Sequence, residues 1–286
     1  MEDSFIDLRD SAPEDVLWDG AKQRLFIVDN VGNRVWQWTD KEGVGSEPYA
    51  VAAMPEGVSE LPENVSLGQA SHLADGTLLV TRFGVPGPDA VHGGIVLIRA
   101  DGSSELVPNL DRSLHRLGIA TAPDGRIYGA SFSAAGGKQS GRINVIEPKT
   151  GETQVADGFG KLIGLAVAGD RLYASDQSAG AIFDAPLDEL PAHADGWHRF
   201  ASLPKPDQIC EGPDGSLFSG QFQAAAGSAD PTAVRWIARD GSVKTLRASP
   251  VVTKPSGVSY DKEHKRLFVA DSGDPAHPGV HVFAVP

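Results

Sequence analysis

The chain has 286 residues, of which 41% are hydrophobic and 22% charged, and its 33 Gly and 20 Pro are typical of a globular protein rich in turns. Its formal net charge of -13 disfavours a nucleic-acid-binding surface, which needs a basic footprint, and disfavours binding to anionic membranes. The single cysteine, Cys210, excludes an intrachain disulfide.

The N-terminal residues show no sign of export. Residues 1–4 (MEDS) are acidic and are not followed by the apolar core of a signal peptide. No apolar run approaches the roughly 18 residues that a membrane-spanning helix needs. We therefore expect a cytoplasmic protein with no nucleic-acid or membrane partner, present as a monomer or a weak homodimer.

A turn followed by a short apolar strand occurs six times along the chain. The strands are anchored at Leu25, Leu78, Ile127, Leu172, Leu217 and Leu267, which lie 53, 49, 45, 45 and 50 residues apart. A period of about 40–50 residues with four short strands per unit is typical of a β-propeller. The sequence therefore predicts an all-β, six-bladed propeller that forms a single domain over residues 1–286.

The two ends of the chain complement each other. A strand-like segment, residues 4–8 (SFIDL), precedes the first repeat, and the sixth repeat stops after its third strand near residue 283. We expect the N-terminal segment to supply the missing fourth strand, because this would close the ring and cover an exposed sheet edge.

Asp-Gly pairs separate the first and second strands of several repeats. They occur at 75–76, 124–125 and 214–215, between apolar runs. Asp-Gly is a strong hairpin signal because Gly adopts the positive φ that tight turns require. Longer insertions at 83–94, 134–141 and 223–231 join second and third strands, so we expect them beside the entrances to the first strands, at the mouth of the central channel. The insertion at 186–198 is expected on the opposite face.

The entrances to the six first strands define one equivalent position per blade. In chain order the residues at this position are Glu14, Gly68, Leu117, Ile163, Asp207 and Ser256. Glu14 and Asp207 are two carboxylates on one narrow rim, and they repel each other unless a cation or a shared proton intervenes. Oxygen ligands at a channel mouth suit Ca²⁺, Mg²⁺ or Mn²⁺. The alternative is that both residues cap backbone amides where loops enter strands.

The chain resembles the senescence-marker-protein/gluconolactonase (regucalcin-like) family of six-bladed propellers. The similarity covers all six blades, and its most specific element is the opening Glu14-x-x-x-Trp18 followed by residues 24–29 (RLFIVD). The resemblance implies a lactone-opening enzyme with a divalent metal at the channel mouth. It assigns Glu14 as a metal ligand, and Asp207 as both a metal ligand and the general base.

The chain departs from the family pattern at two positions. The family's third metal ligand is an asparagine, and here that position is Ile163, which cannot coordinate a metal. A substrate-contacting asparagine in the third blade is also absent, in the segment 115–119 (HRLGI). The candidates to replace the lost oxygens are Gln69, Gln208, Ser256 or a water. The departures leave open a rebuilt metal site, a metal-free enzyme, or a propeller that binds without catalysis.

The sequence thus favours a hydrolase acting on a lactone or ester of a small, fairly apolar molecule. A calcium ion, or alternatively Mn, Mg or Zn, would polarise the carbonyl, and Asp207 would accept a proton from water. His115 is a second catalytic candidate, and Leu117 and Ile163 make the mouth apolar. The expected substrate contacts are Gln69, Arg116, Leu117, Ile163, Gln208 and Ser256. The alternatives are a metal-free cyclase or isomerase using the same pocket, and a non-catalytic ligand-binding propeller.

Overall fold

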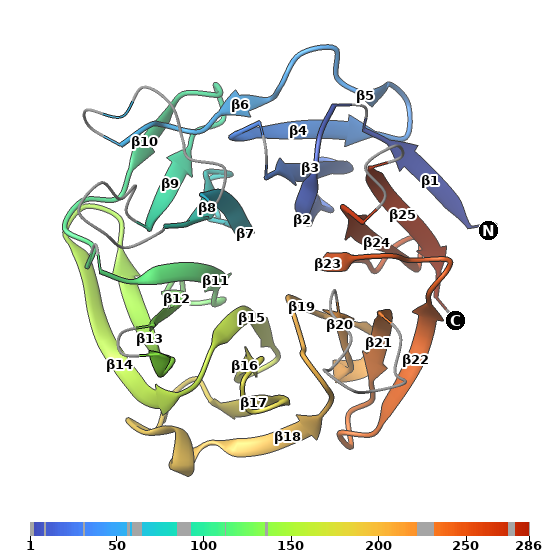
Figure 1. Ribbon diagram of the computed structural model, residues 1–286. Coiled ribbons are helices and arrows are strands. Elements are labelled where there is room, and N and C mark those ends of the chain that lie inside the picture. Colours follow the sequence, from blue (N-terminus) through green and yellow to red (C-terminus); the bar gives the residue numbers. More distant parts are fainter. Residues whose placement is uncertain are drawn as a thin grey trace.

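Six antiparallel sheets surround a central axis in the computed structural model, and each sheet is one blade of a β-propeller (Figure 1). The predicted fold is confirmed, and the blades follow one another in the order of the six repeats. The structure describes residues 3–8, 10–30, 32–55, 58, 65–84, 93–111, 113–134, 137–221, 232–273 and 278–285.

The strands of each blade follow one another outward from the axis. Blade 1 contains β2 (Pro13–Asp19), β3 (Arg24–Asp29), β4 (Arg34–Thr39), β5 (Gly43–Val44) and β6 (Ala50–Val51). Blade 2 contains β7 (Ser66–His72), β8 (Leu78–Phe83), β9 (Gly94–Ile98) and β10 (Ser104–Leu106). Blade 3 contains β11 (His115–Thr121), β12 (Ile127–Ser133), β13 (Ser140–Glu147) and β14 (Gly151–Phe159).

The other three blades complete the ring. Blade 4 contains β15 (Leu162–Ala168), β16 (Arg171–Asp176), β17 (Ala181–Pro186) and β18 (His198–Ser202). Blade 5 contains β19 (Ile209–Glu211), β20 (Leu217–Gln221), β21 (Ala233–Ile237) and β22 (Val243–Ala248). Blade 6 contains β23 (Pro255–Asp261), β24 (Arg266–Asp271), β25 (Gly279–Ala284) and β1 (Ser4–Asp7). Short 3₁₀ helices include η2 (Ala194–Gly196) and η3 (Pro213–Gly215).

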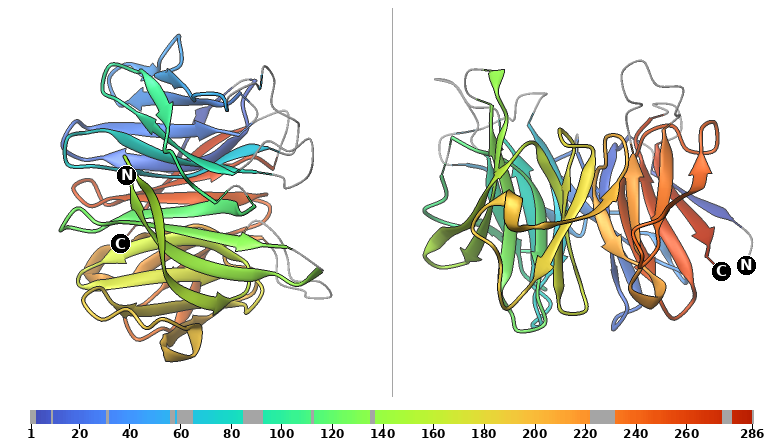
Figure 2. Two further views of the ribbon diagram at one scale, coloured as in Figure 1. Left: turned by 90° about the vertical axis from the view of Figure 1, so that its left-hand side faces the viewer. Right: turned by 90° about the horizontal axis from the view of Figure 1, so that it is seen from below.

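The N-terminal strand closes the ring, as the sequence predicted. β1 pairs antiparallel with β25, with Ser4 opposite Val282 and Asp7 opposite Gly279. Ile6 and Leu8 are buried against the first and last blades. The two termini consequently lie close together at the outer edge of the ring (Figures 1 and 2).

Neighbouring blades cover both faces of each inner strand, which explains the continuous apolar runs. Every residue of β20 and of β24 is buried. Between the last and first blades, the ring of Trp18 stacks on Phe268 with centroids 5.3 Å apart. This blade-to-blade packing fixes the spacing of the first strands around the axis.

The strands run across the thickness of the ring, so strand entrances and exits lie on opposite faces (Figure 2). The predicted Asp-Gly turns between first and second strands have glycines with positive φ, 86° at Gly76 and 88° at Gly125. Of the loops expected at the mouth, residues 85–92, 135–136 and 222–231 lie outside the described residues.

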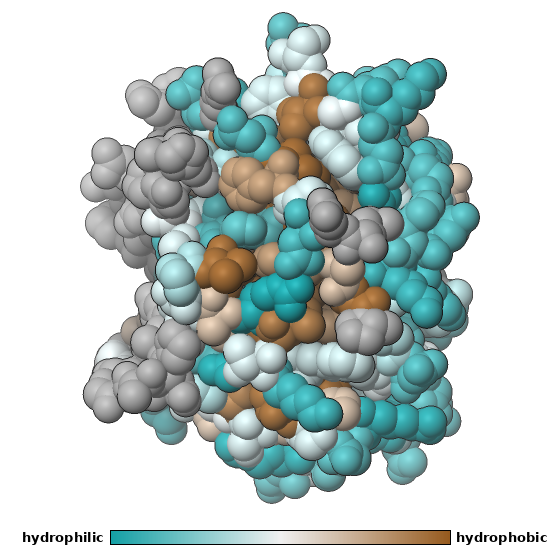
Figure 3. All heavy atoms as spheres, turned by 90° about the vertical axis from the view of Figure 1, so that its right-hand side faces the viewer, coloured by the Kyte–Doolittle hydropathy of each residue, from teal (hydrophilic) through white to brown (hydrophobic). Residues whose placement is uncertain are grey.

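No helix in the described ranges is long and apolar enough to cross a membrane. The side of the ring that carries β1 and β22 presents mainly hydrophilic residues around an apolar band (Figure 3). The oligomeric state expected from the sequence stays a prediction.

Candidate functional site

A β-bulge recurs at the entrance to the first strands and builds the channel mouth. In β7, β11, β15 and β23 two residues oppose one residue of the next strand, and in β2 the extra residue is Glu14. A bulge re-aims side chains and is typical of strand ends beside active sites. The bulges and the entrance to β19 carry the predicted mouth residues Glu14, Gly68, Leu117, Ile163, Asp207 and Ser256.

Contacts between successive blades show that these positions form one ring. The Ser256 hydroxyl donates a hydrogen bond to the carbonyl oxygen of Glu14 at 2.7 Å. A Cβ atom placed on Gly68 would lie 3.2 Å from Leu117, and one on Gly164 would lie 3.0 Å from the carbonyl oxygen of Asp207. The structure therefore brings the six entrance positions together, on the face predicted from the alignment.

Glu14 and Asp207 lie within electrostatic range of each other. Burial raises the pKa of Glu14, while the charge of Lys254, a hydrogen bond from Asn30 at 3.2 Å and the charge of Lys161 lower it. Burial raises the pKa of Asp207 well above its usual range, and the Glu14 charge raises it further against the opposing charge of Lys161. A carboxyl with a raised pKa suits general acid–base chemistry near neutral pH.

Asp15 is a further buried carboxyl, which the sequence analysis missed. It is 2% exposed, and its Oδ2 accepts a hydrogen bond from the Ala70 amide at 2.7 Å. Burial raises its pKa well above the usual range, and the charges of Glu14 and Asp207 add to this effect. Asp15 thus lies beneath the mouth and is electrostatically linked to it.

Two lysines at the mouth were also missed. The Lys161 ammonium donates a hydrogen bond to Oε1 of Gln177 at 3.0 Å and lies 5.8 Å from the centre of the Phe132 ring. Burial lowers the pKa of Lys161, while the charge of Asp207 raises it. A signal was present in the sequence, because Lys161 and Lys254 each stand two residues before the mouth residue of their blade.

An apolar wall lines the mouth on blades 2 to 4. Leu117, Phe132 and Ile163 form a buried cluster, and Phe83 packs against it. His115 lies between two aromatic rings, with centroid distances of 4.7 Å to Phe83 and 4.9 Å to Phe132. The predicted apolar residues Leu117 and Ile163 are therefore part of a larger buried cluster with aromatic members.

The tautomer of His115 follows from its partner. Its Nδ1 is hydrogen-bonded to the carbonyl oxygen of Gly84, so Nδ1 is the donor and Nε2 of the neutral ring carries the lone pair. Burial lowers the pKa of His115, the Gly84 bond raises it, and the Lys161 charge lowers it again. The neutral ring is a candidate proton acceptor.

Arg116, by contrast, does not reach the mouth. Its guanidinium is 1% exposed and binds both carboxylate oxygens of Glu152 on β14, and it also donates to the carbonyl oxygen of Asp111. Asn144 on β13 donates to the same carboxylate. Arg116, the last paired residue before the bulge, turns its side chain outward into the blade and so holds the strands of blade 3 together.

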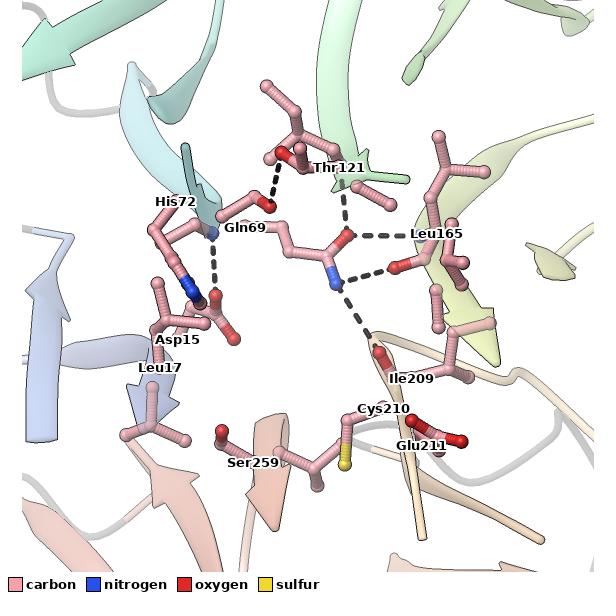
Figure 4. Close-up of a pocket in the computed structure, with 18 residues that line it drawn as sticks. Asp15, Leu17, Gln69, His72, Thr121, Leu165, Ile209, Cys210, Glu211 and Ser259 are labelled. Carbon is pink, nitrogen blue, oxygen red and sulfur yellow. Dashed lines mark hydrogen bonds between the residues drawn. The ribbon is translucent and has the colours of Figure 1, made fainter. Parts of the chain in front are cut away.

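Gln69 crosses the channel instead of facing the mouth (Figure 4). Its Oε1 accepts hydrogen bonds from the amides of Ile119 and Leu165, both at 3.0 Å. Its Nε2 donates to the carbonyl oxygens of Leu165 at 2.9 Å and Ile209 at 3.4 Å. This single side chain links blade 2 to blades 3, 4 and 5.

A hollow adjoins Gln69 in the channel (Figure 4). It is a cavity of about 170 Å³ whose lining includes Gln69, Asp15, Cys210, Glu211 and Ser259. Burial raises the pKa of the Cys210 thiol well above its usual range, and the charges of Asp15 and Glu211 add to this. A thiol held protonated is a poor nucleophile.

Gln208 is the predicted contact with unused hydrogen-bonding capacity. It is 1% exposed, and neither atom of its side-chain amide has a hydrogen-bond partner in the part of the chain that the structure describes. A buried amide of this kind calls for a ligand or water partner.

The donor set at the mouth does not fit a divalent metal. Within the described ranges, no group of three or more His, Cys, Asp or Glu side chains could hold a metal ion. Glu14 and Asp207 supply carboxylates, but Ile163 offers no donor atom, and Lys161 and Lys254 bring positive charge to the same place.

Comparisons with known proteins agree with the architecture. A family model described as the SMP-30/Gluconolactonase/LRE-like region matches residues 12–273. No curated protein matches the chain significantly by sequence.

Solved structures share the fold at low identity. A gluconolactonase from Xanthomonas campestris is 19% identical, with a TM-score of 0.71 over 99% of this chain and 89% of its own. A calcium-binding regucalcin from Agrobacterium tumefaciens is 12% identical, with a TM-score of 0.67 over 97% and 91%. A virginiamycin B lyase from Staphylococcus aureus, solved with quinupristin, is 13% identical, with a TM-score of 0.63 over 100% and 99%.

Proposed function

The chain belongs to the SMP-30/gluconolactonase/LRE-like family, and we propose that it is a hydrolase that opens a lactone or ester at the mouth of its channel. The observation that carries the proposal is the pairing of Asp207, a buried carboxyl with a raised pKa, with an aromatic wall across the same mouth. The similarity to a gluconolactonase supports the reaction type.

The wall indicates a small and fairly apolar substrate. Leu117, Ile163, Phe132 and Phe83 present carbon atoms where a sugar would need hydrogen-bonding partners. Burying an alkyl or aryl group there contributes about 25 cal/mol for each Å² removed from water. Gln208 supplies the unused amide for a polar group of the substrate.

Asp207 is the proposed general base. Water attacks the carbonyl carbon, its proton passes to Asp207, and a C–O bond of the ester then breaks. The departing alkoxide oxygen takes that proton back. The Lys161 ammonium, within electrostatic range of Asp207, is placed to stabilise negative charge on the carbonyl oxygen. The metal assistance expected from the family resemblance is left out of these steps, because the donor set does not fit a divalent ion.

A non-hydrolytic reaction is the second candidate. Nε2 of neutral His115 is an acid/base group beside the apolar wall, and it suits a cyclase or isomerase that needs no metal. The virginiamycin B lyase shares the fold, so this scaffold also supports a lyase. A propeller that binds its ligand without turnover is the third candidate.

A hydrolysis screen with matched variants tests the proposal. Alkyl-substituted lactones and aryl esters are assayed with wild type, Asp207→Asn, His115→Phe and the surface control Asp101→Asn. We expect Asp207→Asn to lower kcat by about 10²–10⁴-fold, the usual range for a general base, with the fold retained. His115→Phe keeps the aromatic stack, so a loss of hydrolysis confined to this variant would make His115, and not Asp207, the base of the reaction. Conversion of the compounds to products other than those of hydrolysis would favour the second candidate. Binding of the same compounds without turnover would favour the third.

A further inference from the structure

The rim of the channel carries a crescent of lysines at one repeated position. Lys161, Lys205 and Lys254 each stand two residues before the mouth residue of blades 4, 5 and 6. The equivalent residue of blade 3 is His115. Because the blades are related by the propeller repeat, these positions lie on the same face as Glu14 and Asp207.

Two members of the crescent act on the carboxylates. The charges of both Lys161 and Lys254 lower the pKa of Glu14, and both also lower that of Asp207. The charge of Lys205 lowers the pKa of Lys161. The ammonium groups of Lys161 and Lys254 are thus both within electrostatic range of both carboxyls.

Lys161 is held in its place by its neighbours. Its Nζ donates to Gln177 at 3.0 Å and lies above the Phe132 ring at 5.8 Å. Beside it, Ile163 is 2% exposed and packs in the apolar cluster at the position where a third oxygen donor was expected. At the entrance to β15, Ile163 therefore removes the oxygen donor, and Lys161, two residues before it, adds a positive charge.

We propose that the ammonium groups of Lys161 and Lys254 are the permanent counter-charges of Glu14 and Asp207, so that the mouth functions without a divalent cation and binds none. Even when both carboxyls are ionised, the two ammonium groups already balance their charge. A divalent ion would leave an excess of two positive charges next to the ammonium groups, and like charges at close range repel strongly where water is scarce. These counter-charges belong to the protein without substrate, whichever reaction the mouth catalyses.

Metal binding, measured without any substrate, tests the proposal. Wild type is treated with a chelator, dialysed, and titrated calorimetrically with Ca²⁺, Mn²⁺ and Zn²⁺, and its metal content as purified is measured by elemental analysis beside Glu14→Gln. We expect no stoichiometric metal and no saturable binding to the mouth below millimolar concentrations. About one equivalent of metal in wild type that is lost in Glu14→Gln would overturn the proposal.

Rebuilding the donor set provides the converse test. The double variant Lys161→Met/Ile163→Asn restores an oxygen donor and removes one counter-charge, and we expect it to bind Ca²⁺ or Mn²⁺ at least tenfold more tightly than wild type. The matched control Lys205→Met/Ile163→Asn alters the neighbouring member of the crescent and should bind tenfold more weakly than the Lys161 double variant. Equal affinities of the two double variants would refute the role of Lys161. If asparagine at this buried position prevents folding, the metal content of wild type and Glu14→Gln decides alone.

Discussion

Replacing Gln69 by leucine should destabilise the whole ring. The side chain accepts from two buried amides and donates to two carbonyl oxygens on three other blades. Each buried group left without a partner costs about 1–3 kcal/mol, so the two amides alone account for about 2–6 kcal/mol. The adjoining cavity of about 170 Å³ can admit water to some of these groups, which lowers the expected loss to about 3 kcal/mol.

Chemical denaturation and calorimetry measure this loss. A loss of about 3 kcal/mol corresponds to a Tm lower by about 6–12 °C, at the 2–4 °C per kcal/mol found for chains of about 150–250 residues. The control is Gln154→Leu on β14, an exposed side chain bonded to Asp157, which should change the stability by less than about 0.5 kcal/mol. A loss below about 1 kcal/mol for Gln69→Leu would refute the argument, because the four backbone groups would then have found other partners.

Three further predictions concern closure, pH and the thiol. Deleting the first ten residues removes β1 together with buried Ile6 and Leu8. Each such side chain contributes about 1.5–3 kcal/mol, so the free energy of unfolding measured by denaturation should fall by about 4 kcal/mol or more. A loss as small as that of a frayed terminus would show that β1 does not close the ring. Burial raises the pKa of Asp271, but hydrogen bonds from His281 and backbone amides outweigh this and lower it to about 2. The ionised Asp271 therefore stabilises the fold above its unfolded-state pKa, and this stabilisation is lost as the pH falls through about 2. It amounts to about 1–2 kcal/mol after allowing for solvent screening. Acid-unfolding curves of Asp271→Asn should lack this pH-dependent contribution. Cys210 should be alkylated more slowly at pH 8 in the native protein than after unfolding, because its raised pKa keeps the partly buried thiol protonated, and equal rates in both states would contradict that raised pKa.

The sequence by itself determined the architecture. The six-fold repeat, the Asp-Gly turns and the spare strand at residues 4–8 specify blades, hairpins and closure, because all three signals are local in the chain and recur. Aligning the strand entrances also placed Glu14 and Asp207 on one rim, since equivalent positions of a repeat meet around one axis.

The direction of individual side chains was decided only by the tertiary structure. Arg116, which is paired just before the bulge, points outward to Glu152, while Gln69, two residues beyond the equivalent position of blade 2 and within the bulge, turns inward across the channel. Both were expected as substrate contacts, because alignment gives the position of a residue along the strand but not the face on which its side chain lies when the strand contains a bulge. In such a strand the alternation of faces is broken, so a shift of one residue exchanges blade interior for channel.

The electrostatic character of the mouth likewise required the fold. Lys161 and Lys254 are 93 positions apart in the chain, and each looks like an ordinary surface lysine in its own segment. Only ring closure brings both within range of Glu14 and Asp207. Charge interactions depend on distance through space and on burial, and neither is contained in a local sequence pattern.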